Sequence, residues 1–440
     1  MRFVFAVALS FLFLVSLCSN ARADEVTRGI VEALHEKGVL DDESYRRLIE
    51  KEAAPAPQAA PAPASAERPL DGALTQFEEG FARLSGDTVK LKLSVLFQAG
   101  WLIDDADFSV TSPPTTGRTL GVDNQFFVRR ARLFFDGQLS KKIGFRISTE
   151  LSQSTGILYD AYVFADYIPY ARVTLGQFKV PFGVEGVEAL GAHVLVSRSM
   201  ATNFIHNPTL RDLGVMLNGK YETKLHERPL GMGYAVAALN GTGRNAQEDN
   251  DHKDVAGRVW VNPLVPGLTV GGSFLVGKAS PAAGLKTDRQ RWAADLDYSP
   301  PAVKGLKLRG EFLRDRKYFT AYASKNITET TGLPAFGRYA HSYGWYTLAA
   351  YKVDGLKGHW RYLNGFEPAV RYEYLDEDMA TPDDARNRTT VGLNYYMNKW
   401  SRVMANYEIT HADAALRVRS LETIDTITHH LFTTILQVRF

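Results

Sequence analysis

From Thr88 to the last residue, the chain alternates apolar and polar side chains with a period of two. One example is the segment 143–151, whose residues are Ile143, Gly144, Phe145, Arg146, Ile147, Ser148, Thr149, Glu150 and Leu151. Such a period predicts β-strands with one apolar and one polar face. In a soluble β-protein the polar face meets water, whereas in an outer-membrane barrel the apolar face meets lipid and the polar face lines an aqueous lumen.

The connections between alternating segments favour the barrel. We count sixteen such segments between residues 88 and 440. Short connections, such as 139–142 and 263–266, alternate with long polar ones, such as 103–123 and 278–287. Short turns on one side of the membrane and long loops on the other are typical of transmembrane barrels. We therefore expect an all-β fold, a 16-stranded antiparallel transmembrane β-barrel, although fourteen to eighteen strands would also fit the pattern. A periplasmic soluble β-protein is the distant alternative.

The N-terminus has the pattern of a secretory signal peptide. A positive residue, Arg2, precedes an apolar run that is too short for a membrane helix, and Ala21-Arg22-Ala23 forms a small-x-small cleavage site. We expect this peptide to be removed together with Cys18, the one cysteine of the chain. The mature protein would then have no disulfide bond.

Composition changes mark the expected domains. An apolar stripe with a Gly38 break predicts a short helical, coiled-coil-like hairpin, with a loosely ordered tail as the equal alternative. An Ala/Pro tract after it predicts an extended spacer. The expected organisation is a signal peptide (1–23), a periplasmic helical segment (24–52), a linker and lead-in (53–87) and the barrel domain (88–440).

Net charge indicates no anionic partner by itself. The chain has 51 lysines and arginines against 49 acidic residues, and removal of Arg2 and Arg22 would make the mature chain neutral. A preference for anions must therefore come from where the charges lie. We expect no nucleic-acid partner.

The C-terminal segment 427–440 alternates up to a terminal aromatic residue, Phe440. Outer-membrane barrels typically end in this way, because the assembly machinery reads the closing strand. We therefore expect Phe440 to be recognised by that machinery and the mature chain to lie in the lipid of the bacterial outer membrane. Aromatic residues near strand ends would form the interfacial girdles; these are Trp101, Trp292, Tyr298, Trp345, Tyr396, Trp400 and Tyr407.

Several stretches resemble the phosphate-selective porin O/P family. They are Phe127-Val128-Arg129-Arg130-Ala131-Arg132-Leu133, Asp160-Ala161-Tyr162-Val163, Leu175-Gly176-Gln177-Phe178-Lys179-Val180-Pro181-Phe182-Gly183, Arg211-Asp212-Leu213-Gly214-Val215 and Asn240-Gly241-Thr242-Gly243. The resemblance covers about residues 86–440. It implies a sixteen-stranded, trimeric porin with its third loop folded into the lumen and basic residues that conduct anions.

The stretch 180–208 is the candidate constriction loop. It carries Val187, Leu190 and the run Val194-Leu195-Val196, which is more apolar than a solvent-exposed loop should be. We expect this loop to pack against the inside of the barrel wall.

An anion filter needs fixed guanidinium and ammonium groups at a narrow point, where they replace lost water. Alternation places Arg130 and Arg132 on one face. Arg146 should point inward, because an arginine at the lipid midplane would cost roughly 2–4 kcal/mol. The predicted pore-lining, anion-binding residues are Lys90, Lys92, Arg130, Arg132, Arg146, Arg172, Lys179 and Arg198. Each could instead be a solvated lumen residue paired with an acid such as Glu150 or Asp160.

These features predict a porin for passive diffusion of small anions, with phosphate or polyphosphate as candidates. A general or organic-acid-preferring porin is the alternative, and a barrel enzyme is a more distant one. His193 and Ser197 share the loop, but they lack the Gly-x-Ser-x-Gly context of a hydrolase nucleophile. The sequence has no metal-ligand cluster and no phosphate-cradling glycine loop, so we expect no catalytic residue, no metal and no cofactor.

Overall fold

The computed structural model describes eleven ranges of the chain: 82–85, 90–106, 123–152, 157–206, 211–225, 228–282, 285–319, 338–354, 364–380, 385–413 and 426–440. The chain divides into two compact units, Met1–Glu67 and Arg68–Phe440, and all described residues belong to the second. The expected signal peptide, the helical segment 24–52 and most of the linker 53–87 lie outside the described residues.

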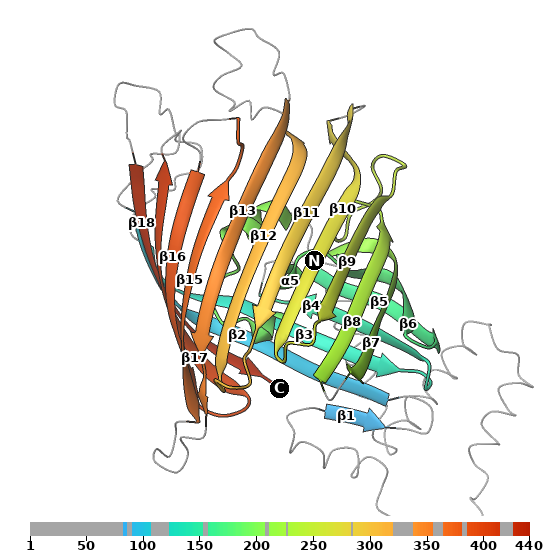
Figure 1. Cartoon of the computed structure of the whole chain (residues 1–440), viewed down its shortest axis with the longest axis horizontal. Coiled ribbons are helices and arrows are strands. Elements are labelled where there is room, and N and C mark those ends of the chain that lie inside the picture. Colours follow the sequence, from blue (N-terminus) through green and yellow to red (C-terminus); the bar gives the residue numbers. More distant parts are fainter. Residues whose placement is uncertain are drawn as a thin grey trace, which may run out of the picture. The chain divides into compact units, whose positions relative to one another are not determined.

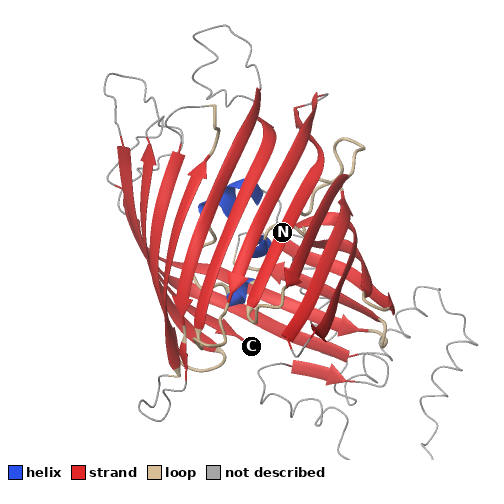
Figure 2. Cartoon of the chain, in the orientation of Figure 1, coloured by secondary structure: helices blue, strands red, loops and turns tan. Residues whose placement is uncertain are grey.

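Sixteen long strands form a closed antiparallel barrel (Figures 1 and 2), as the sequence predicts. They are β2 (Lys90–Ala106), β3 (Asp123–Gln138), β4 (Ile143–Glu150), β5 (Ile157–Ile168), β6 (Ala171–Lys179), β7 (Arg211–Leu225), β8 (Arg228–Leu239), β9 (Asp254–Asn262), β10 (Leu268–Ala282), β11 (Leu285–Tyr298), β12 (Leu306–Phe319), β13 (Arg338–Tyr351), β15 (Gly365–Asp376), β16 (Ala385–Tyr396), β17 (Ser401–Asp413) and β18 (Thr426–Arg439). Two short strands add further pairs to the sheet. β1 (Ala82–Ser85) pairs with β2, and β14 (Val353–Asp354) pairs with β15.

The barrel closes between its last and first long strands. β18 pairs with β2 from His429, opposite Ala106, to Arg439, opposite Leu96. The backbone of Phe440 continues the ladder by exchanging hydrogen bonds of 2.6 and 3.1 Å with Val95. Below that point β1 pairs with the start of β2, so the exposed stretch of that strand also has a partner.

Charged residues face inward and apolar residues face outward. On β15 the side chains of Val370 and Tyr372 are 45% and 43% exposed, whereas those of Arg371 and Glu373 are 2% and 0% exposed. This distribution of polar and apolar side chains is the inverse of that in a soluble protein. It is the arrangement that lipid outside and water inside the barrel require. It decides the question that the alternation alone leaves open, in favour of a membrane barrel.

The prediction of a long loop at residues 278–287 is wrong. β10 continues to Ala282 and β11 begins at Leu285, and the two strands pair through this stretch, with Lys278 opposite Asp288. The two side chains lie 3.5 Å apart as an ion pair. Polar side chains replace apolar ones here on the outward face, so the sequence loses its strand pattern while the backbone hydrogen bonds continue.

The stretch from Val180 to His206 folds into the barrel, as Figure 2 shows for its helical pieces. These pieces are α5 (Val184–Val187), η2 (Leu190–Ala192) and α6 (Met200–His206). Phe182, Ala201 and Ile205 pack in one buried cluster with wall residues that include Leu239, Leu275 and Leu313. The predicted packing of this loop on the inner wall is therefore confirmed. Among the described residues, no helix has the length and hydropathy to cross a bilayer.

Candidate anion site in the lumen

A β-bulge turns an extra arginine into the lumen. Gln98 of β2 pairs with Arg130, but its neighbour Ala99 pairs with Val128, so Arg129 is the extra residue on β3. The Arg129 guanidinium donates to the hydroxyl of Ser197 on the constriction loop at 3.4 Å. Three arginines of β3, at positions 129, 130 and 132, therefore lie on the inner side.

A second bulge, on β5, does the same for Tyr159. Ser148 pairs with Asp160 and Thr149 with Leu158, which leaves Tyr159 as the extra residue. Three guanidinium groups lie against its ring, at 3.8 Å for Arg132, 4.8 Å for Arg211 and 4.4 Å for Arg244, measured from each guanidinium carbon to the ring centroid. The negative face of an aromatic ring attracts cations, so Tyr159 can hold these like charges together.

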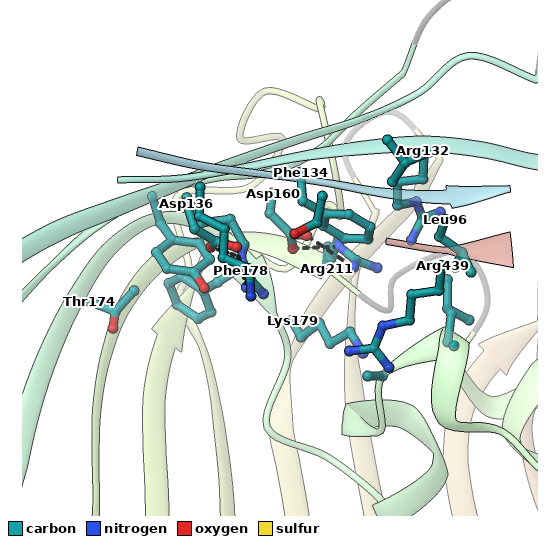
Figure 3. A pocket seen from close by; sticks show the side chains of 18 of the residues that line it. Leu96, Arg132, Phe134, Asp136, Asp160, Thr174, Phe178, Lys179, Arg211 and Arg439 are labelled. Carbon is teal, nitrogen blue, oxygen red and sulfur yellow. Dashed lines mark hydrogen bonds and ion pairs between the residues drawn. The ribbon is translucent and has the colours of Figure 1, made fainter. Parts of the chain in front are cut away.

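Arg132 and Arg211 of this group border a lumenal cavity of about 390 Å³. Figure 3 shows Arg132, Lys179, Arg211 and Arg439 around it, with the hydrogen bonds between Arg211 and Asp160 drawn as dashed lines. Among its lining residues, seven are cations: Lys92, Arg132, Arg146, Arg172, Lys179, Arg211 and Arg439. Only Asp136 and Asp160 among the lining residues are acidic, so the lining has more basic than acidic side chains.

Several of these arginines are paired with acids. Arg146 lies 2.6 Å from Asp136, and both side chains are partly exposed. Arg172 has the same relation to Asp166, also at 2.6 Å. Buried pairs lie deeper, where Arg132 contacts Glu150 at 3.0 Å and Arg211 contacts Asp160 at 2.7 Å. These four arginines are therefore lumen residues paired with acids, which is the alternative to anion binding that the sequence left open. Each of them still lines the cavity.

The constriction loop holds one cation of the cavity, Lys179, and brings a further one, Arg198, to the same region. Lys179 donates to the carbonyl oxygens of Val187 and Glu188 at 3.1 and 2.6 Å, which fixes its ammonium group at the root of the loop. The Nε and Nη2 atoms of Arg198 are buried and have no hydrogen-bond partner among the described residues. Burial lowers the pKa of Arg198 to about 10, so it remains charged at neutral pH.

Hydrogen bonds between charged side chains on the opposite wall and the loop backbone hold the loop in place. Glu311 accepts the backbone N–H of Val184 at 2.7 Å, and Glu373 accepts that of Met200 at 2.6 Å. Arg371 donates to the carbonyl oxygens of Ser197 and Arg198 at 2.9 and 3.2 Å. The backbone of the loop is thereby fixed against the wall.

The predicted site residues are not all brought together. Lys92, Arg132, Arg146, Arg172 and Lys179 line the cavity. Arg130, which hydrogen-bonds to Gln98, and Arg198 are not among its lining residues; the positive charges of Arg132 and Arg198 lie close enough to Arg130 to interact with it. Lys90 is exposed at the start of β2 and does not line the cavity.

The sequence reasoning missed five residues of this region: Arg129, Tyr159, Arg211, Arg244 and Arg439. The inward position of Arg439 could have been predicted from the sequence, because alternation from an inward Gln437 places it inward too. The inward positions of Arg129 and Tyr159 could not be predicted in this way, since only the bulges turn them inward.

The fold and the basic lumen define a porin-type channel of the bacterial outer membrane. The model for phosphate-selective porin O and P matches residues 102–296 and 305–440, so the chain belongs to that family. This confirms the resemblance found in the sequence.

Solved structures show the same fold at low sequence identity. The anion-selective porin from Comamonas acidovorans is 14% identical, with a TM-score of 0.54, over 80% of this chain and 100% of that one. Salmonella typhi OmpF, in complex with daunomycin, is 12% identical, with a TM-score of 0.53, over 81% and 100%. The channel DcaP of Acinetobacter baumannii is 11% identical, with a TM-score of 0.51, over 81% and 99%. No curated protein matches the chain.

Proposed function

We propose that this porin passes small anions by diffusion and binds oxyanions of the phosphate type on the way. The observation that carries the proposal is the cavity with seven cationic and two acidic lining residues. Guanidinium groups match the geometry of phosphate oxygens and form strong, charge-assisted hydrogen bonds with them. The family name and the anion-selective porin of the same fold support this choice.

A second candidate is a preference for organic acids, and it has its own observation. Phe134, Tyr162, Phe178 and Leu96 line the same cavity as the cations. A ligand with a carboxylate and an apolar body would contact both kinds of side chain, whereas inorganic phosphate would use only the charges.

We propose a channel rather than an enzyme, and a homotrimer like other porins of this kind. The Ser197 hydroxyl accepts a hydrogen bond from Arg129, and His193 Nε2 lies 3.8 Å from Glu188. His193 is buried, and burial lowers its pKa well below the usual range. These contacts hold the loop and give Ser197 no base. Among the described residues, no group of three or more His, Cys, Asp and Glu side chains could hold a metal ion.

Reversal potentials in planar bilayers under a potassium chloride gradient test the proposal. We expect anion selectivity, with chloride current blocked by low concentrations of inorganic phosphate. Block by benzoate at lower concentration than phosphate would favour the organic-acid candidate. Cation selectivity, or chloride current that neither anion reduces, would refute anion binding in the cavity. Cross-linking of the purified protein in detergent tests the trimer.

A further inference from the structure

Two arginines of β12 point away from the lumen, near the end of the barrel that carries the long loops. Arg314 lies opposite Trp292 of β11 and Tyr343 of β13, and Arg316 lies opposite Gln290 and His341. The residues that alternate with this arginine pair, Leu313 and Asp315, are 0% exposed and face inward. Arg314 itself is exposed, so the pair belongs to the outer wall.

An aromatic belt lies level with Arg314 and extends from there toward the periplasmic end. Its members on neighbouring strands are Phe274, Trp292, Phe312, Tyr343, Trp345, Tyr372 and Tyr374, with ring centroids 5.6–6.5 Å apart between adjacent rings. Trp292 is 54% exposed. Aromatic girdles of this kind mark the interface between the apolar band of a barrel and the lipid headgroups.

Strand geometry places Arg316 at the outer headgroup level. Tyr351 is 44% exposed at the periplasmic end of β13, and His341, opposite Arg316, is about ten residues away along the strand. At roughly 3.3 Å per residue and a tilt of about 40°, this spans ~25 Å, the height of the apolar band of such barrels. Arg316 therefore lies where the headgroups of the outer leaflet begin, and Arg314, level with the aromatic belt, can reach them with its long side chain.

No described acidic side chain neutralises the positive charge of the pair. Within the described ranges, neither guanidinium has a carboxylate partner; Arg316 instead lies over the ring of Tyr339, 4.3 Å from its centroid. The nearest outward acid on β11, Asp288, is paired with Lys278 at 3.5 Å. Two adjacent guanidinium groups beside a lipid surface attract a phosphate, which they can bind through paired N–H groups.

We propose that Arg314 and Arg316 bind the phosphate of a glycolipid in the outer leaflet, with the aromatic belt packing against its acyl chains. The acyl chains of such a lipid would lie along the belt while its phosphate reached the arginines. This site is on the outside of the barrel and is independent of the anion pathway in the lumen.

The test compares the purified full-length protein in phosphatidylcholine vesicles with and without bis-phosphorylated lipid A. We expect lipid A to raise the thermal unfolding midpoint of the wild type, and the double variant Arg314→Gln/Arg316→Gln to lose most of this shift. Its affinity for lipid A, measured by native mass spectrometry, should fall about tenfold or more. The matched control, Lys141→Gln/Lys142→Gln, removes two exposed cations from the periplasmic turn 139–142 and should keep the full shift.

Two further arms separate the possible ligands. Lipid A without phosphates should give little shift, and inorganic phosphate added to the buffer should neither produce the shift nor abolish it. The proposal is overturned if the dephosphorylated lipid stabilises the wild type as well as the phosphorylated one, if free phosphate reproduces the effect, or if the double variant keeps the full shift. Should the double variant fail to fold, the wild-type arms alone still decide between lipid phosphate and the other ligands.

Discussion

At the scale of single residues, the ring of Tyr159 lies against three guanidinium groups that would otherwise repel one another. A cation–π contact contributes about 0.5–2 kcal/mol, more when the pair is shielded from water. We expect Tyr159→Leu to weaken block of the channel by phosphate about tenfold, which corresponds to roughly 1.4 kcal/mol. Tyr159→Phe, which keeps the ring, should stay close to wild type.

The measurement is the phosphate concentration that halves the chloride current of single channels. Tyr351→Leu, on the outside of the barrel, serves as the control and should leave this value unchanged. Equal weakening by the Leu and Phe variants would show that the hydroxyl, and not the ring, is what the site uses.

Single residues also show the limit of sequence reasoning for this site. Alternation places Arg130, Arg132 and Arg146 inward, and the structure agrees, because one wrong assignment would put a charge in lipid. Arg129 and Tyr159 break the alternation through bulges. A bulge inserts one residue without a local composition signal, so no count along the sequence could find it.

At the scale of elements, the constriction loop depends on Arg371. This residue contacts the carbonyl oxygens of Ser197 and Arg198 and the carboxylates of Glu185 and Glu373, at 2.9–3.4 Å. Breaking a buried ion pair from one side costs about 3–5 kcal/mol, because the remaining charge is left unpaired. We expect Arg371→Ala to release the loop from the wall and to raise single-channel conductance and current noise.

A matched control is Arg386→Ala. Arg386 is also paired with an acid, Glu377, at 2.6 Å, but its side chain is 47% exposed. Exposed pairs contribute at most about 1 kcal/mol, so this variant should conduct like the wild type. If Arg371→Ala also conducts like the wild type, the loop is held by its apolar packing alone.

The buried end of the loop should make its docking sensitive to acid. His206 of α6 packs on Phe182, with ring centroids 5.1 Å apart, and burial lowers its pKa well below the usual range. The folded state therefore binds fewer protons than the unfolded state. The stabilisation from the neutral ring is fully present above the unfolded pKa of about 6.5 and is lost as the pH falls below it.

We expect the thermal unfolding midpoint of the wild type to fall between about pH 6.5 and 4.5 more steeply than that of His206→Gln. His252→Gln, in an exposed loop, is the control. Parallel curves for wild type and His206→Gln would mean that His206 does not contribute to the acid sensitivity.

The sequence predicts elements better than it predicts their ends. The sixteen strands could be predicted because lipid on one side and water on the other enforce a period of two along each strand. The stretch 278–287 fails because β10 and β11 extend beyond the membrane, where the polar Lys278–Asp288 pair replaces the apolar face. The apolar loop was predicted from its composition, but its wall contacts join residues that lie far apart in the chain.

At the scale of the whole molecule, the chain is nearly neutral, with 51 basic and 49 acidic residues, yet its charges are unevenly distributed. The cavity is lined by seven cations and two acids, whereas buried arginines on the other wall, such as Arg258 and Arg371, are paired with acids. Selectivity then comes from a local field and not from net charge. Such a field should be screened by salt, because the Debye length falls from about 10 Å at 0.1 M to about 3 Å at 1 M.

We therefore expect the ratio of chloride to potassium permeability to fall severalfold when the salt rises from about 0.1 to about 1 M. Reversal potentials at a fixed concentration ratio measure it. Arg129→Gln/Arg211→Gln should have a low ratio that changes little with salt, because the field is already weakened. Lys141→Gln/Lys142→Gln, outside the lumen, should follow the wild type. A ratio that stays high at 1 M would contradict selection by a screened field and would mean that direct hydrogen bonds from the arginines, which salt barely screens, select the anion.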